Sequence, residues 1–387
     1  MHNRKVYILE AFRSPFAKLY GGFTHWRADD MLSQFIQRVL KQSSKIIPEK
    51  IEQVFMGCAN QAGEDSRNIA RQGVLLAGLS SSITGVTINS LCTSGMDAIQ
   101  MAAYSVAMGE TDLCLAGAVD NMSRSPFILN RQTKEQVDST IGWRFINPKL
   151  YQYYQPYSMA ETAELLANSQ KISRTQQDEY AFRSREAYET ALRTGFYDTI
   201  LLSLDKDLIQ DEQHRLMSMD MLANFPPMLR GGANVTLGNS ARIGDGVVLL
   251  AIASEDYIKK HRFRPLVRIK ASARAAVHPD QMGLAPLAAS QKVLKRLNLN
   301  IYQMHQIELS EAFAVQTLAF IHTWKVPMVL VNPNGGEIST GKPLSVSSAT
   351  LVLNLAKAMQ RKNSIRYGLA TACAGLGLGT AMVLEAV

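Results

Sequence analysis

The chain has 387 residues, of which 47% are hydrophobic and 19% are charged, and its formal net charge at pH 7 is +8. This composition is typical of a globular protein of two or three domains and excludes a disordered chain. No apolar run approaches the roughly 18 residues that a membrane-spanning helix needs, so we expect no membrane association.

The basic residues do not predict a nucleic-acid partner, because they are scattered and no basic stripe is interleaved with aromatic residues. A phosphate-bearing small molecule such as coenzyme A would explain the charge as well, and so would no ligand. The four cysteines lack CxxC spacing and lie in or beside apolar runs, which favours a reducing compartment. We therefore expect a cytoplasmic protein in which Cys58 and Cys114 are core residues.

The first part of the chain alternates short apolar strands with a longer helical pattern, which predicts a parallel sheet covered by helices. A strand is predicted over residues 83–89, a helix over 95–108 and a second strand over 113–119. Cys92 lies in the turn before the helix. Taken alone, a cysteine is more often a small core residue, but a helix N-terminus lowers a thiol pKa and can bind an oxyanion, which favours a nucleophile here.

The middle of the chain breaks this alternation. A helix is predicted to begin at the capping box Ser173-Arg-Thr-Gln176, and residues 216–228 form an irregular, methionine-rich stretch. A strand over 244–252 then resumes the earlier pattern. The predicted domains are an N-terminal half, an inserted loop domain and a C-terminal half, at residues 1–120 with 244–264, 121–243 and 265–387.

The second half repeats the first, with a strand over 328–332, a helix over 347–359 and a strand over 367–371. Lys342 occupies the strand-to-helix turn equivalent to that of Cys92, and Cys373 follows the last strand. Ligands collect at the carboxyl ends of parallel strands. Duplicated halves that face each other would therefore bring these three residues together.

Some of these motifs have other interpretations. Residues 336–342 nearly match the phosphate loop GxxxxGK[ST], but Pro343 supplies neither the hydroxyl that would hold magnesium nor a backbone N–H, which disfavours a nucleotide hydrolase. Ser310, after the predicted strand 306–309, can be explained as a helix cap. No spacing of histidine and cysteine suggests a metal site.

Stretches spread over nearly the whole chain resemble the signatures of thiolases, and among these the 3-oxoadipyl-CoA thiolases are the most similar group. The matching stretches are residues 13–15, 63–71, 86–95, 121–127, 140–148, 158–164, 236–239, 332–336 and 368–377. The resemblance implies an α/β thiolase fold, in which duplicated βαβαβ halves form a layered α-β-α-β-α core with an inserted loop domain.

The resemblance also implies roles for five residues. Cys92 takes up the acyl group, Cys373 moves a proton at the acyl α-carbon or the incoming thiol, and the amides of Cys92 and Gly377 form one oxyanion hole. In the second hole the family has an asparagine that orients a water and a histidine that donates to the oxyanion, and these positions are Ser310 and Lys342 here. A cationic lysine can stabilise a thiolate or an enolate oxygen, but it does not copy a neutral imidazole.

Further expectations follow from the family. Coenzyme A or acyl-CoA is expected as a substrate, with no permanently bound cofactor and no metal. The residues aligned with coenzyme A contacts are Arg215, Met159, Ser240, Met282 and Phe313. A homodimer or homotetramer is expected, with strands near Cys92 at the interface. His278 is an alternative source of an imidazole, although a surface loop position is the simpler interpretation.

Two functions remain open. The first is a thiolase-like acyltransferase that acts on acyl-CoA or 3-oxoacyl-CoA through a Cys92 thioester, in thiolysis or Claisen condensation, with chemistry altered by Lys342 and Ser310. The second is a coenzyme A-binding or assembly protein with thiolase architecture and little activity. Retention of both cysteines favours the first function, and the residues at 310 and 342 favour the second. A trapped acyl-enzyme would distinguish them.

Overall fold

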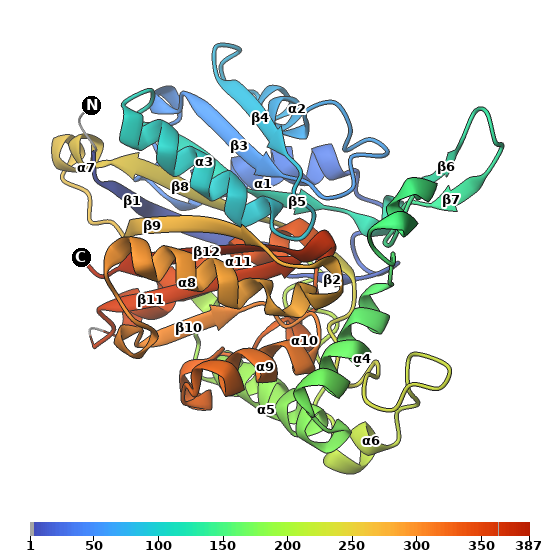
Figure 1. The fold of residues 1–387 in the computed structure, drawn as a ribbon. Helices are drawn as coiled ribbons and strands as arrows, with labels where there is room; N and C mark the ends of the chain where they lie inside the picture. Colours follow the sequence, from blue (N-terminus) through green and yellow to red (C-terminus); the bar gives the residue numbers. More distant parts are fainter. Residues whose placement is uncertain (1–3, 363) are drawn as a thin grey trace.

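Twelve strands are present in the computed structural model, which describes residues 4–362 and 364–387. They are β1 (Val6–Arg13), β2 (Ala17–Lys18), β3 (Gln53–Gly57), β4 (Thr84–Ile88), β5 (Leu113–Asp120), β6 (Phe127–Leu129), β7 (Gln136–Asp138), β8 (Gly244–Ser254), β9 (Val267–Ala276), β10 (Gln306–Leu309), β11 (Tyr367–Ala374) and β12 (Leu378–Glu385). The main sheet has the order β10-β11-β12-β9-β1-β8-β5-β3-β4, and β2 pairs with β8. Strands β6 and β7 form a separate hairpin (Figure 1).

The helices lie in layers around and between the two halves of this sheet (Figure 1). Those outside the N-terminal half are α1 (Ala28–Gln42), α2 (Ile69–Leu76) and α7 (Glu255–His261), and those outside the C-terminal half are α8 (Ala285–Leu297) and α9 (Ala314–Trp324). Two further helices, α3 (Ser94–Met108) and α11 (Leu344–Arg361), pack against each other between the halves. The expected α-β-α-β-α layering is therefore confirmed.

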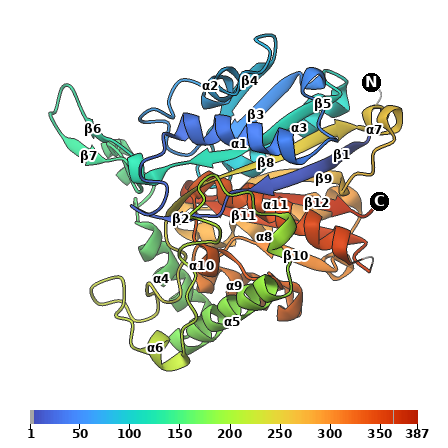
Figure 2. The same cartoon turned by 180° about the vertical axis from the view of Figure 1, so that it is seen from behind.

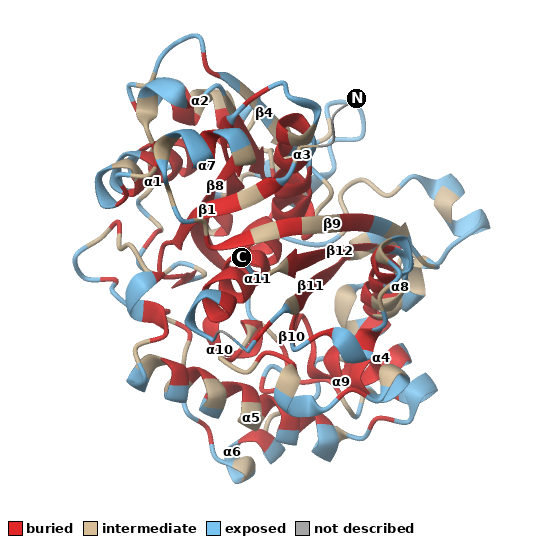
Figure 3. Ribbon diagram, turned by 90° about the vertical axis from the view of Figure 1, so that its left-hand side faces the viewer, coloured by how far each residue is buried: buried red, intermediate tan, exposed pale blue. Residues whose placement is uncertain are grey.

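The central helix pair is buried because both helices are rich in small and apolar residues. Every residue of α11 from Leu344 to Met359 is buried, as Figure 3 shows. Where the pair begins, a methyl group on Gly95 would lie only 2.3 Å from the carbonyl oxygen of Ser345, so a larger residue would push the helices apart. This close approach brings together the turns that precede α3 and α11.

Strands β1 and β9 join the two halves. They pair antiparallel over three residues, from Val6 opposite Ile269 to Ile8 opposite Val267. The two expected sheets are thus one continuous hydrogen-bonded path. Apolar side chains fill the layer between the halves, and two further clusters fill the layers under the outer helices.

The prediction of a parallel sheet is wrong, because the main sheet is mixed: β3 pairs parallel with β4 and β5, and β10 with β11, whereas its other strand pairs are antiparallel. Most of the predicted elements are confirmed, but three further details are wrong. Residues Met328–Leu330 form a 3-10 turn instead of a strand, and only Val331 bridges to Ile307. Helix α9 begins at Ala314 and Phe313 occupies its cap position, so Ser310 does not cap it. Cys373 lies within β11, one residue before its end, and does not follow the strand.

The inserted segment contains three helices, α4 (Met159–Gln170), α5 (Arg174–Arg193) and α6 (Met219–Ala223). The predicted capping box is confirmed, because Ser173 and Gln176 each accept a hydrogen bond from the other's backbone N–H. Both α4 and α5 pack against α9 of the C-terminal half, as Figure 2 shows from behind. The domain boundaries themselves stay a prediction.

No helix within residues 4–362 and 364–387 combines the length and the apolar character that crossing a membrane requires.

Candidate active site

The turn between β4 and α3 places Cys92 at the start of a helix in the centre of the molecule. Leu91 adopts a left-handed conformation, with φ of 58°. The hydroxyl of Ser94 donates to the Leu91 carbonyl at 2.5 Å, and the side chain of Asn89 accepts from the Leu91 N–H at 3.0 Å. Such a conformation is costly for a non-glycine residue and is maintained here by neutral hydrogen bonds. It holds the buried Cys92 in a fixed position before α3.

The turn before α11 contains a buried ion pair. The ammonium of Lys342 donates to Oε2 of Glu337 at 2.6 Å, and the two side chains are only 8% and 6% exposed. Glu337 belongs to α10 (Glu337–Thr340), and the same oxygen accepts from the backbone N–H of Glu311 at 2.9 Å. Because lone buried charges are costly, each partner depends on the other.

Cys373 is hydrogen-bonded by Ser310 from the neighbouring parallel strand. The Ser310 hydroxyl donates to the sulfur of Cys373 at 3.8 Å and accepts from the Cys373 N–H at 3.3 Å. It also accepts from Nε2 of Gln316 at 2.9 Å. A hydroxyl has one donor and two acceptor positions, and all three are engaged. This geometry favours a role in orienting Cys373 over a role in holding a water.

The two thiols and the ammonium act on one another electrostatically. Burial raises the pKa of Cys92 to about 12, and the positive charge of Lys342 opposes this rise. Burial also raises the pKa of Cys373, against the effects of Lys342 and then Ser310. For Lys342 burial lowers the pKa, but the Glu337 carboxylate and then the two thiols raise it, and the net direction is upward. The lysine is therefore an ammonium at neutral pH.

The turn after Cys373 lies against the turn of Cys92. Gly377 has φ of 74°, and a methyl group there would lie 2.2 Å from the carbonyl oxygen of Val277, so only glycine fits. A methyl group on Gly375 would meet Leu91 at 3.4 Å and the sulfur of Met159 at 4.0 Å. Helix α4, through Met159, thus reaches the mouth of the site.

The other residues aligned with coenzyme A contacts lie in different environments. Arg215 is exposed, whereas Ser240, Met282 and Phe313 are buried. Ser240 bridges to Phe313, and its hydroxyl donates to the Thr236 carbonyl at 2.7 Å. The roles of these residues stay predictions.

His278 lies on the surface, where its side chain contacts Asp280 and Tyr154. Its side chain is half exposed and forms a hydrogen bond to Asp280. Its ring lies 5.2 Å from that of Tyr154, between centroids. The simpler interpretation from the sequence agrees with this placement.

No role was assigned to Glu337 from the sequence, and its ion pair with Lys342 was not predicted. A signal was available, since Glu337 and Lys342 flank a single helical turn that ends at Gly341. Gln316 was also missed, and its contact with Ser310 depends on how α9 lies beside β10.

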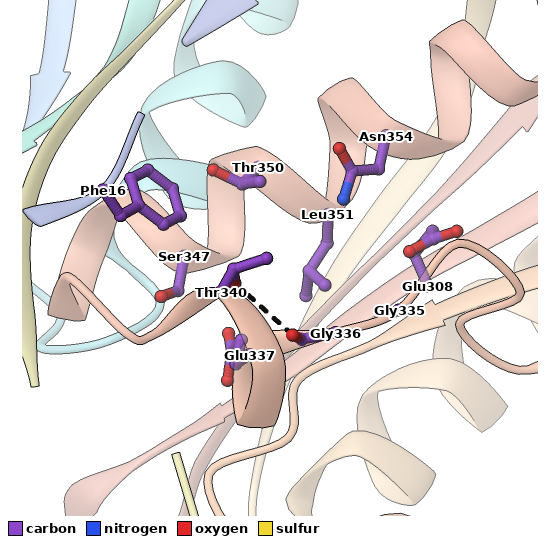
Figure 4. A pocket seen from close by; sticks show the side chains of 10 residues that line it. All are labelled: Phe16, Glu308, Gly335, Gly336, Glu337, Thr340, Ser347, Thr350, Leu351 and Asn354. Carbon is purple, nitrogen blue, oxygen red and sulfur yellow. Dashed lines mark hydrogen bonds between the residues drawn. The ribbon is translucent and has the colours of Figure 1, made fainter. Parts of the chain in front are cut away.

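A small cavity of about 10 Å³ lies on the side of α10 that faces α11 (Figure 4). This is about the volume that one water needs. Glu337 and Glu308 both line it, together with Thr350 and Asn354. Burial raises the pKa of Glu308 to about 8, and Nε2 of Gln306 donates to its carboxyl group at 2.7 Å.

Among the described residues, no group of three or more histidine, cysteine or acidic side chains is arranged to hold a metal ion.

Comparison with known protein families gives a match over nearly the whole chain. Residues 6–256 match the thiolase N-terminal domain, and residues 263–386 match the thiolase C-terminal domain. The chain belongs to the thiolase family. Its two matched domains meet at the site formed by Cys92, Lys342 and Cys373.

Individual thiolases are similar along the full length. The beta-ketoadipyl-CoA thiolase of Escherichia coli is 40% identical over 99% of this chain and 100% of its own, and that of Pseudomonas putida is 38% identical with the same coverage. The structure of human mitochondrial 3-ketoacyl-CoA thiolase in complex with CoA has a TM-score of 0.91 and 28% identity, and covers 100% of this chain and 99% of the human one. The acetyl-CoA acetyltransferase of Bacillus anthracis has a TM-score of 0.89 and 29% identity, with both chains fully covered.

Proposed function

We propose that this thiolase-family chain is an acyltransferase that carries an acyl group on Cys92 and uses coenzyme A thioesters as substrates. The observation that carries the proposal is the convergence of two buried thiols and one ammonium, on two adjoining turns and the end of β11, where each changes the pKa of the others. Such perturbed groups are typical of nucleophilic catalysis. The relatives whose names contain thiolase or acetyltransferase support the same reaction class.

The specific reaction is thiolysis of a 3-oxoacyl-CoA or its reverse. The Cys92 thiolate attacks the 3-oxo carbon, and the bond between carbons 2 and 3 breaks. The electron pair passes to the departing acetyl-CoA enolate, which takes a proton from Cys373. The thiol of a second coenzyme A then gives its proton to Cys373 and attacks the Cys92 thioester, which releases the shortened acyl-CoA and the Cys92 thiolate.

Lys342 supplies positive charge where negative charge develops. The positive charge of its ammonium lowers the pKa of Cys92, which burial raises, and so favours the thiolate. It acts in the same way on Cys373, near which the enolate oxygen would form. The Glu337 contact at 2.6 Å uses one of three ammonium donors and leaves others for an oxyanion. The backbone amides of Cys92 and Gly377 form the other oxyanion hole in this scheme.

Ser310 orients Cys373 in the proposed mechanism. A hydrogen bond donated to the sulfur favours its thiolate form and fixes its direction. Gln316 in turn fixes the hydroxyl of Ser310. The serine therefore acts through Cys373 and does not need to touch the substrate.

Coenzyme A is proposed to bind beside α4 and the loop that contains Arg215. Burial lowers the pKa of Arg242, and repulsion from the positive charge of Arg215 lowers it further. A phosphate would relieve this repulsion. Met159, at the start of α4 in the loop domain, lies against the turn after Cys373, where a pantetheine arm would enter.

A homodimer or homotetramer is proposed from the family and from the edge of the sheet. Strand β4 ends the hydrogen-bonded path, and Val86 on it is exposed. Large exposed apolar side chains also occur nearby in sequence on α2 and α3, at Leu75, Leu76, Met101, Tyr104 and Met108. Because an uncovered apolar edge strand invites pairing, a second copy of the chain is the partner that we propose. Light scattering coupled to gel filtration tests this.

The test of function is a turnover assay with 3-oxoacyl-CoA and coenzyme A, in which acetyl-CoA and the shortened acyl-CoA are separated by chromatography. We expect equal amounts of both products from the wild type and none from Cys92→Ala. Coenzyme A binding by the wild type without any product would instead favour the second function, a binding or assembly protein.

A further inference from the structure

An amine lies beside the cysteine that the proposed function acylates. Lys342 is buried three residues before Ser345, and Cys92 is buried three residues before Gly95. These two segments approach so closely that a methyl group on Gly95 would lie 2.3 Å from the Ser345 carbonyl oxygen. Lys342 and Cys92 also affect the pKa of each other. A neutral amine attacks a thioester readily, and the amide that results does not return the acyl group to a thiol. A neutral Lys342 would therefore inactivate the protein during its own reaction cycle.

The groups that face Lys342 decide whether it is neutral. They are Glu337 on α10, Cys92 on the turn before α3 and Cys373 on β11. When Cys92 carries an acyl group it has no ionisable proton, and its contribution disappears. Burial favours the neutral amine at that moment, so the Glu337 carboxylate is the principal negative charge that remains.

Glu337 is well placed for this task. Its Oε2 accepts hydrogen bonds from the Lys342 ammonium at 2.6 Å and from the Glu311 N–H at 2.9 Å, and these two bonds fix the orientation of the carboxylate. Its Oε1 is buried and has no hydrogen-bond partner among the described residues. Among the described residues no second cation pairs with this carboxylate, so its negative charge acts on the lysine.

We propose that Glu337 protects the acyl-enzyme by keeping Lys342 in its ammonium form, and that loss of this carboxylate lets the acyl group move from the sulfur of Cys92 to the nitrogen of Lys342. In that step the amine lone pair forms a C–N bond with the acyl carbon and the C–S bond breaks. The leaving thiolate of Cys92 takes the proton that the nitrogen loses. Glu337 is thus a positioning and protecting residue, and not a group that touches the substrate.

This inference rests on the proposed acylation of Cys92, and the experiment separates the two. Full-length wild type and Glu337→Gln are incubated with acetyl-CoA at pH 7 to 9, treated with hydroxylamine to remove thioesters, and digested for peptide mass spectrometry. We expect acetyl-Lys342 in Glu337→Gln at a level at least about tenfold above the wild type, since one pKa unit changes the neutral fraction tenfold. The level should rise with pH.

Two control variants make the result specific. Glu308→Gln makes the same change at the other acidic residue that lines the cavity beside Glu337, and it should resemble the wild type (Figure 4). Glu337→Gln combined with Cys92→Ala should lose acetyl-Lys342, because the acyl group passes through Cys92.

The outcomes are distinguishable. A Cys92 thioester in Glu337→Gln before hydroxylamine, without acetyl-Lys342 afterwards, overturns the protective role and leaves the proposed function intact. Absence of any Cys92 thioester in the wild type overturns both. If Glu337→Gln does not fold, the wild type alone is measured from pH 7 to 10. Acetyl-Lys342 that appears only as pH rises supports the proposal, and equal formation at pH 7 and pH 10 overturns it.

Discussion

The turn of Cys92 and the turn of Lys342 precede the two central helices, yet they are stabilised in different ways. Neutral hydrogen bonds from Ser94 and its neighbours maintain the strained Leu91 before Cys92. A buried ion pair with Glu337 maintains the second turn. The duplicated architecture thus provides two equivalent positions, and local residues decide that one presents a nucleophile and the other a charge.

The largest expected effect comes from removing the nucleophile from the first turn. Cys92→Ala should abolish the acyl adduct and lower turnover by at least about a thousandfold, because the other thiol of the site, Cys373, moves protons in the proposed mechanism and does not carry the acyl group. The free energy of unfolding should change little, since the substitution removes one small sulfur. Turnover and urea unfolding check the two parts, and Cys58→Ala, at a buried cysteine outside the site, is the control. Retained turnover would show that the first turn is not the acyl site.

Removing the charge from the second turn should have the next largest effect. Lys342→Met should lower turnover about a hundredfold to a thousandfold, the usual cost of one lost oxyanion donor. It should also lower the free energy of unfolding by about 3–5 kcal/mol, because Glu337 is left buried and unpaired.

A double variant separates these two effects. Lys342→Met with Glu337→Gln makes the second turn neutral, as the first turn is, and should restore most of the stability without restoring turnover. Recovery of turnover in the double variant would mean that the lysine matters only for stability. Urea unfolding and the chromatographic assay measure the two quantities.

Most of the strands could be predicted from the sequence where their burial is complete. All eight residues of β5 are buried, and its apolar run identified it. The same criterion failed at Met328–Leu330, where the apolar run follows Pro327 and Val329 is 69% exposed. Proline lacks the N–H that a strand needs for pairing, so this segment turns and only Val331 reaches β10.

The site could be predicted in its positions but not in its contacts. That Cys92 and Lys342 occupy equivalent turns follows from the strand and helix pattern. The partner of Lys342 depends on how the single turn α10 directs Glu337, and the contact of Ser310 with Cys373 depends on the register that sets Leu309 opposite Thr371. Side-chain direction and register of this kind are set by tertiary packing, which the local pattern does not contain.

A smaller effect on turnover is expected at Ser310, which contacts Cys373. Ser310→Ala removes the hydrogen bond to the Cys373 sulfur, so the pKa of Cys373 should rise further and turnover should fall about tenfold. The pH profile should move to higher pH, which a purely structural role would not cause. Ser290→Ala is the control, because its buried hydroxyl has no hydrogen-bond partner among the described residues. An unmoved profile would contradict the assignment.

The smallest effect on turnover is expected at Glu308, which should instead change how stability depends on pH. Its carboxyl pKa is ordinarily 4.5 and is raised to about 8 by burial. The folded protein therefore keeps this proton up to about pH 8, while the unfolded chain releases it near 4.5, and stability falls as pH rises through that window. Glu308→Gln should remove on the order of 3 kcal/mol of this fall between pH 5 and 8, as measured by urea unfolding. Parallel curves for both proteins would contradict the raised pKa.

The most direct test of the account is the intact mass of the wild-type protein after brief mixing with acetyl-CoA, with Cys92→Ala measured in parallel. We predict one acetyl group per chain in the wild type, none in Cys92→Ala, and its loss on addition of either hydroxylamine or coenzyme A. Absence of the adduct with acetyl-CoA and with 3-oxoacyl-CoA, in protein that binds coenzyme A, would contradict covalent catalysis at Cys92.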